Sequence, residues 1–241
     1  MENKFNLPTE TVELPSKGLL YSPTSPLAEG KVEMKYMTAR EEDILSNVNF
    51  IKDGSVLDRL LQSMIVTKIN YNELLSADKD ALLIAARILG YGKDYKFTYG
   101  GEEHVIDLTT LDHKEIDTTL YQNGNNFNFT LPASTVDVTF KLLNQTDEKN
   151  LQKELEGLKK ISKNVPELST RLKYIITSVQ GDSDQKTIRE FVDNYLLAKD
   201  SKALREYIKK IQPGVDIVFS PPGDTSTVNI PVGTEFFWPD A

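Results

Sequence analysis

The sequence predicts an α+β protein in which two small helical bundles are joined by antiparallel β-hairpins. Apolar residues recur every three or four positions over 39–89 and again over 146–211, as in amphipathic helices. Apolar and polar residues alternate beside turn residues around 95–108, 127–142 and 216–232, which is typical of hairpin strands. We therefore expect two blocks of helices with β structure between and after them.

Length and composition fit a soluble globular protein. The 241 residues suffice for one large domain or two small ones, and the hydrophobic content of 39% and charged content of 27% are ordinary. No apolar run approaches the length that spans a bilayer, and the first residues, Met-Glu-Asn-Lys-Phe, lack the apolar core of a signal peptide. We expect a cytosolic protein with no membrane partner.

Charge and cysteine content exclude several classes of function. The sequence contains no cysteine, which excludes disulfides, thiolate zinc sites, iron–sulfur clusters and cysteine nucleophiles. The net charge of −8 argues against general binding to a phosphate backbone, because such binding needs a surplus of lysine and arginine on one face. The pairs Lys159-Lys160 and Lys209-Lys210 fit solvated helix faces better than a nucleic-acid patch.

Thr38 marks the best-specified helix start in the sequence. Its hydroxyl can cap the first turn, and Glu41, three residues later, completes a capping box. Glu41, Glu42 and Asp43 place three carboxylates near the positive end of the helix dipole. A general acid/base site is the alternative interpretation, but helix-start chemistry explains the same acids without a reaction. For Arg40 we expect an ion pair with a downstream carboxylate.

Residues 1–93 are expected to form an N-terminal module with a strand and three helices. Pro15 and Gly18 predict a turn with apolar ends over 14–21, and alternation over 31–37 predicts a strand that leads into the Thr38 cap. The helices are predicted over 39–48, with Val48 buried, over 55–67, and over 79–89, the last capped by Ser76 or Asp78 and stopped at Gly90-Tyr91-Gly92.

Residues 94–143 are expected to be rich in β structure. Gly100-Gly101 lies between two alternating runs and predicts a hairpin over 95–108. The following Glu102-Glu103 suggests a loop longer than two residues. A second strand pair is predicted over 127–131 and 136–142, with the turn between them.

The rest of the chain is expected to form a helical bundle and a final hairpin. The bundle, residues 144–213, is predicted to have helices over 146–162, 166–179 and 185–197, and a fourth capped by Asp200 or Ser201 that ends before Pro213. Residues 214–241 are predicted to form a hairpin around Ser220–Asp224 and an aromatic tail that pack on the middle segment. We interpret Phe236, Phe237 and Trp238 as a core staple rather than a docking patch.

No catalytic, cofactor or metal site is predicted. His104 and His113 are the only imidazoles, and with Glu102, Glu103 and Asp112 they show no recognised spacing of metal ligands. The sequence contains neither a phosphate-binding glycine motif nor a nucleophile elbow. The residues by themselves therefore indicate a non-enzymatic protein without cofactors.

A set of short motifs occurs in one order along the chain. The motifs are Leu14-Pro-Ser-Lys-Gly-Leu-Leu-Tyr21, Met37-Thr-Ala-Arg-Glu-Glu42 with Leu45, Leu74-Leu75, Asp78, Arg87-Ile-Leu-Gly-Tyr-Gly92, Pro213-Gly-Val-Asp216 and Phe236-Phe-Trp-Pro239. In order and spacing they resemble the baseplate hub assembly proteins of bacteriophages with long contractile tails. The resemblance covers most of the chain in outline.

The resemblance implies a non-enzymatic, chaperone-like assembly factor that binds baseplate hub proteins during tail morphogenesis, in the host cytoplasm or at the virion baseplate. A permanent structural subunit of the baseplate or tail is the second hypothesis, and a hydrolase acting through Glu41, Glu42 and Asp43 is the third. The oligomeric state stays open. The expected partner-binding residues are Leu19, Leu20, Tyr21, Phe236, Phe237 and Trp238.

Many members of this family carry Cys-x-x-Cys pairs in two hairpins, as in a zinc ribbon. The corresponding stretches here, Tyr99-Gly-Gly-Glu102 and Ser220-Pro-Pro-Gly223, contain no thiol. We therefore expect the hairpins at 95–108 and 216–232 to pack side by side as a metal-free ribbon.

Overall fold

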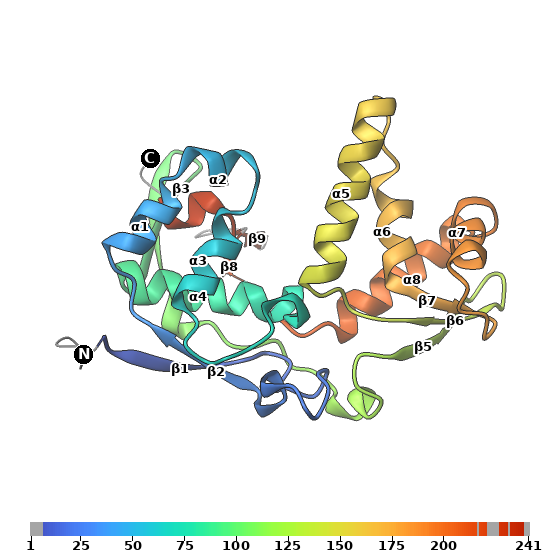
Figure 1. Ribbon diagram of the computed structural model, residues 1–241, viewed down its shortest axis with the longest axis horizontal. Coiled ribbons are helices and arrows are strands. Elements are labelled where there is room, and N and C mark those ends of the chain that lie inside the picture. Colours follow the sequence, from blue (N-terminus) through green and yellow to red (C-terminus); the bar gives the residue numbers. More distant parts are fainter. Residues whose placement is uncertain (1–6, 216, 221–226, 231, 239–241) are drawn as a thin grey trace.

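The computed structural model describes residues 7–215, 217–220, 227–230 and 232–238. These residues form eight α-helices and small antiparallel sheets of two or three strands, which confirms the α+β class (Figure 1). Among them, no helix has both the length and the apolar character that crossing a membrane requires.

Two hydrophobic cores define two lobes, which lie left and right in Figure 1. The first core takes buried residues from positions 14–108, and the second takes most of its residues from positions 121–211. The chain then returns to the first core with Ile217, Phe236 and Phe237. The β-rich middle segment is thus divided between the two cores.

The first lobe begins with strand β1 (Thr9–Glu13), which pairs antiparallel with β2 (Lys31–Lys35). The predicted strand before Thr38 is therefore confirmed, and its Val32 and Met34 are buried. The helices that follow are α1 (Ala39–Leu45), α2 (Val48–Lys52), α3 (Val56–Met64) and α4 (Ser76–Tyr91).

The helix predicted over 39–48 ends earlier than expected. Asn47 has an extended backbone, and its side chain accepts hydrogen bonds from the amides of Asn49 and Phe50, so it starts the separate helix α2. Asparagine favours such N-caps over helix interiors because its side chain competes for backbone groups. Val48, expected to be buried, consequently lies in the first turn of α2 with 60% of its surface exposed.

The start of α4 also differs from the prediction. The N-cap is Leu75, so neither Ser76 nor Asp78 caps the helix through its side chain. At the other end, Gly92 adopts φ +86° and terminates the helix as predicted.

The hairpin of β3 (Asp94–Tyr99) and β4 (Glu102–Asp107) is confirmed, but its loop is shorter than expected. Tyr99 pairs with Glu102, so Glu102 and Glu103 belong to the strand. Gly100 and Gly101 alone form the turn, with φ of 62° and 88°, a conformation that favours two glycines. Strands β8 (Val218–Phe219) and β9 (Val228–Asn229) form the predicted second hairpin, and residues 221–226 between them lie outside the described residues.

The second lobe contains a sheet of order β5-β6-β7, with β5 (Phe127–Thr130), β6 (Asp137–Phe140) and β7 (Ile176–Val179). The predicted pair β5-β6 is confirmed. The helices packed with it are α5 (Gln145–Ile161), α6 (Glu167–Ile175), α7 (Gln185–Asn194) and α8 (Ala198–Ile211).

Strand β7 corrects the helix predicted over 166–179. The helix α6 ends at Ile175, and the next four residues pair with the open edge of β6. Ile176, Thr177 and Val179 are β-branched and fit a strand as well as they fit an apolar helix stripe. Residues 176–179 form a strand because they pair with the edge of β6, and sequence periodicity does not show that this edge is available.

Candidate functional site

The turn over residues 14–21 is held tightly, as its proline and glycine predict. The amide of Leu14 donates to the Gly30 carbonyl at 2.7 Å, and Lys17 and Gly18 both adopt positive φ, 51° and 77°. A Cβ atom on Gly18 would lie 2.3 Å from the carbonyl oxygen of Ala28. Only glycine fits at this position, because both its conformation and its space exclude a side chain.

The carboxylate of Asp78 joins this turn to the first turn of α4. It accepts hydrogen bonds from the Ser16 amide at 2.9 Å, from the Ser16 hydroxyl at 2.7 Å and from the Tyr21 hydroxyl at 2.5 Å. The Tyr21 oxygen in turn accepts from the Leu75 amide at 3.1 Å. Three of the motifs that carry the family resemblance therefore meet in one hydrogen-bonded network, which we call the Asp78 network.

The Asp78 network lies where the two cores meet. Leu14 belongs to the first core and Leu20 to the second, while Tyr21 packs against both. On the side of α4, Leu74 belongs to the first core and Leu75 to the second. The network thus fixes the chain at the junction of the lobes.

The Asp78 network is largely buried, and burial shifts the pKa values of its acidic members. Burial raises the pKa of Asp78, and the hydrogen bonds from Tyr21 and Ser16 only partly oppose this effect. Burial and the neighbouring carboxyl group of Asp78 raise the pKa of Tyr21, so its hydroxyl remains a proton donor. Asp78 and Ser16 have no exposed surface, so a substrate has no access to them.

An open groove lies beside the Asp78 network. It is lined by Leu19, Leu20, Tyr21 and the two residues that follow, and by the loop 121–125, with a volume of about 620 Å³; we call it the Tyr21 groove. Asn125 fixes the loop, since its side chain exchanges two 2.8 Å hydrogen bonds with the backbone of Leu142. Residues 122–126 of this stretch, Gln-Asn-Gly-Asn-Asn, are polar, and no pattern in the sequence indicates that the loop lies beside Leu19.

The six residues predicted to bind a partner do not share one surface. Leu19 is 43% exposed at the Tyr21 groove, and Tyr21 is partly exposed, whereas Leu20 is buried. In Figure 1 the short helix η5 (Thr234–Phe237, red) lies at the top of the first lobe, far from the turn over residues 14–21 at its lower edge.

The aromatic tail packs into the first core. Phe236 and Phe237 are 1% and 2% exposed, and Trp238 is partly buried against the same core. The Phe236 ring lies 4.7 Å from the Tyr95 ring of β3. This position agrees with a core staple for Phe236 and Phe237. It leaves Leu19 as the exposed member of the predicted contact set, with Tyr21 and Trp238 partly exposed.

Glu41 forms the predicted capping box, but its environment is not that of a catalytic acid. It accepts from Thr38, from the Ser63 hydroxyl and from the Lys35 ammonium group at 2.9 Å or less. Burial alone would raise the pKa of Glu41, but these hydrogen bonds lower it to about 2. Glu42 and Asp43 are exposed, whereas Glu41 is buried.

Arg40 does not form the expected ion pair. Its side chain is exposed, and the ion pairs among the described residues do not include it. Its exposure at the second position of α1 agrees with a solvated surface side chain.

Acids at the third position of a helix take two different roles in this fold. Glu41 and Asp147 follow the polar N-caps Thr38 and Asn144 and close capping boxes, and Glu41 also accepts from the Ser63 hydroxyl. Asp78 and Asp200 follow the apolar N-caps Leu75 and Leu197 and bond to distant segments. For Asp200 these are the amides of residues 133 and 134, at 2.7 and 3.0 Å. An apolar N-cap before such an acid is the sequence signal that could have identified both tertiary contacts.

Substituting Glu41→Gln should lower the free energy of unfolding by about 1–3 kcal/mol at neutral pH, because the ionised carboxylate is the better acceptor for Lys35. The pKa of Glu41 falls from about 4.3 in the unfolded chain to about 2 in the folded one. Its contribution is therefore present above about pH 4.3 and lost as the pH falls towards 2. Urea titrations of both proteins across this range measure it.

Glu42→Gln is the matched control on the same helix and should change stability by less than about 0.5 kcal/mol. The same variant tests the hydrolase hypothesis. A complete loss of biological function with unchanged stability would favour catalysis through Glu42, whereas intact function argues against it.

Neither histidine belongs to a group of possible metal ligands within the described residues. The His104 ring packs 4.5 Å from Phe219 and 5.7 Å from Phe97, and His113 forms a backbone bridge to Val215. Across the part of the chain that the structure describes, no three histidine or acidic side chains gather so that they could hold a metal ion.

The chain was compared with protein-family models, with curated proteins and with solved structures, and no match was found in any of the three.

Proposed function

We propose that this protein is a non-enzymatic, chaperone-like assembly factor that binds baseplate hub subunits of a contractile-tailed phage in the host cytoplasm. The observation that carries the proposal is the Asp78 network, which joins Ser16 and Tyr21 of one motif of the family resemblance to Leu75 and Asp78 of two others. In the same turn the Leu19 amide donates to the Ser16 carbonyl at 3.1 Å, and the exposed Leu19 side chain lines the Tyr21 groove. An assembly factor needs such a rigid apolar surface and no catalytic group.

The proposal is tested by isolating the tagged protein gently from infected cells and identifying what accompanies it. We expect hub subunits with the unaltered protein and a loss of most of them with Leu19→Asp, because a carboxylate would have to be buried in the interface. Val48→Asp, at another exposed apolar position in the first lobe, should retain them. Absence of baseplate proteins, or equal recovery with both variants, would contradict the proposal.

Mass spectrometry of purified virions separates the proposed factor from a permanent subunit. A transient factor is absent from the finished particle. Several copies per virion would instead favour the structural role.

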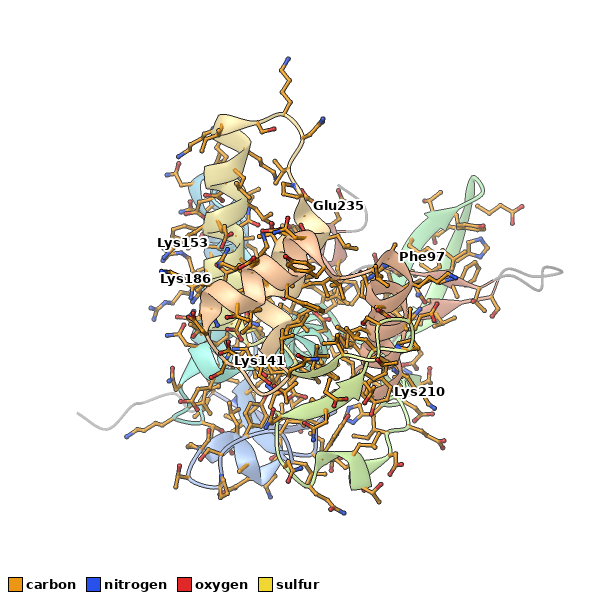
Figure 2. The ribbon with its side chains drawn as sticks, turned by 90° about the vertical axis from the view of Figure 1, so that its right-hand side faces the viewer. Phe97, Lys141, Lys153, Lys186, Lys210 and Glu235 are labelled. Carbon is orange, nitrogen blue, oxygen red and sulfur yellow. The ribbon has the colours of Figure 1, made fainter. Side chains whose placement is uncertain are left out.

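We further propose that the hairpins β3-β4 and β8-β9 act as a metal-free ribbon. Support comes from Phe219 of β8, whose ring lies 5.0 Å from Phe97, 5.8 Å from Tyr99 and 4.5 Å from His104. Figure 2 shows the β3-β4 hairpin, with Phe97 labelled, standing out from the body. In this proposal the aromatic rings hold the two hairpins together. In the family that the sequence resembles, a zinc ion would do so.

A strong chelator should leave the melting temperature of the purified protein unchanged, because ring packing rather than a metal joins the hairpins. Phe219→Ala, in contrast, should lower stability by about 1–3 kcal/mol, since Phe219 is only partly buried. Calorimetry with and without chelator measures both effects. A fall in the melting temperature on chelation, restored by added zinc, would overturn the metal-free ribbon.

A further inference from the structure

A second groove lies where the lobes meet, between the start of α4, the β6-α5 connection, α6 and α8. Its volume is about 230 Å³, and its lining is largely aliphatic, with Leu142, Leu172 and Ile208 among the residues that form it. Leu168 of α6 also lines it and has 50% of its surface exposed. We call this feature the Arg205 groove, after the arginine that α8 contributes to it.

Positive charge predominates around this apolar lining. The groove is lined by Lys141, Arg171 and Arg205 but by a single acid, Glu148, in a chain whose net charge is −8. Figure 2 faces the second lobe and shows Lys141 near the lower end of α5. The lining of the groove thus holds more cations than acids, whereas the whole chain holds more acids than cations.

The three cations differ in how far they are already paired. Lys141 lies 2.7 Å from Asp147, and Arg171 donates two hydrogen bonds to Glu148, at 2.9 and 3.1 Å. Arg205 donates only from Nε, to the Ser201 carbonyl of its own helix at 3.2 Å. Within the described residues no carboxylate pairs with Arg205, so its two terminal nitrogens are available to an acceptor from outside.

We propose that the Arg205 groove binds a segment of a partner protein that carries aliphatic side chains next to a carboxylate. The volume is below the roughly 300–1,000 Å³ of pockets that enclose small molecules, so it suits one or two side chains of a peptide. The aliphatic lining receives those side chains, and the planar guanidinium group of Arg205 can hold the carboxylate through two hydrogen bonds. This inference goes beyond the proposed function, because it concerns a different surface and assumes no phage protein.

The test uses the purified full chain and short fluorescent peptides that contain a leucine pair flanked by glutamate, by glutamine or by lysine. Fluorescence anisotropy should show the glutamate peptide binding about tenfold more tightly than the glutamine peptide, and the lysine peptide binding least. Added salt should reduce the affinity for the glutamate peptide most, because the higher affinity of this peptide is electrostatic in origin.

Two variants with matched controls assign the binding to the groove. Arg205→Gln should reduce the affinity for the glutamate peptide about tenfold, to that of the glutamine peptide, whereas Lys202→Gln on the same helix should not. Leu168→Ala should reduce the affinities for the glutamate and glutamine peptides alike, by several-fold. Leu197→Ala, at a leucine that is also 50% exposed but lies outside the groove, should leave binding unchanged.

Three outcomes would overturn the inference. The first is that none of the peptides binds, and the second is that binding is indifferent to their charge or to Arg205→Gln. The third is a dimer of this chain that Arg205→Gln dissociates, which would assign the groove to a second copy.

Discussion

Asp78→Ala is expected to lower the free energy of unfolding by about 3–5 kcal/mol and the melting temperature by roughly 10 °C. The substitution leaves the amide and hydroxyl of Ser16 and the hydroxyl of Tyr21 without their acceptor. These donors lie in or beside the buried junction of the two cores, so water cannot readily replace the lost carboxylate. Urea unfolding followed by circular dichroism measures the change.

Asp78→Asn refines this result because it keeps the shape of the side chain. One oxygen still accepts from the Ser16 amide, and the amide group can donate to hydroxyls that rotate, so we expect a cost well below that of Asp78→Ala. Asp43→Ala, which removes an exposed acid from α1, should change stability by less than about 0.5 kcal/mol. A cost below 1 kcal/mol for Asp78→Ala would show that the Asp78 network does not fasten the junction.

The raised pKa of Asp78 also predicts a pH dependence. A carboxyl group whose pKa is raised by folding favours the folded state fully below its unfolded pKa of about 3.9, and this contribution is lost as the pH rises through the folded pKa. Asp78→Asn cannot ionise and should lack this component. As the pH rises through the folded-state pKa of Asp78, the free energy of unfolding of the unaltered protein should therefore fall relative to that of Asp78→Asn.

Phe236→Ala is expected to cost about 3–5 kcal/mol, the range found when a buried phenylalanine is truncated. The side chain is 1% exposed, and its ring lies 4.7 Å from Tyr95 and 5.9 Å from Phe237, so the substitution opens a cavity between η5 and β3. The substitution removes the contact between η5 and the β3-β4 hairpin. Thermal or urea unfolding should show one large shift in the midpoint.

Leu19→Ala is the comparison that separates a core residue from a contact residue. Leu19 is 43% exposed, so its truncation should cost less than about 1 kcal/mol while reducing the apolar surface at the Tyr21 groove. If Phe236→Ala proved neutral in stability but abolished binding to hub subunits, the aromatic tail would be a docking patch instead of a staple.

Much of the local structure could be predicted because its determinants lie a few residues apart. The capping box of Thr38 and Glu41 is confirmed, and the hairpin turns at Gly100-Gly101 as predicted, although its loop is shorter than expected. The wrong predictions concern segments whose residues suit two local structures about equally well. Residues 176–179 suit a helix or a strand, and only the free edge of β6 made them a strand.

By itself, the sequence determined the α+β class, the positions of the hairpins, the approximate positions of most helices and the absence of thiol chemistry. The tertiary structure decided the surroundings of Asp78 and Arg205, because the partners of Asp78 lie 57 and 62 residues away and the groove around Arg205 draws on four separate segments. A periodic pattern reports which residues face a core, but it does not report which segments share that core. Long-range hydrogen bonds and grooves exist only once the lobes have packed, so these sites became visible only in the folded chain.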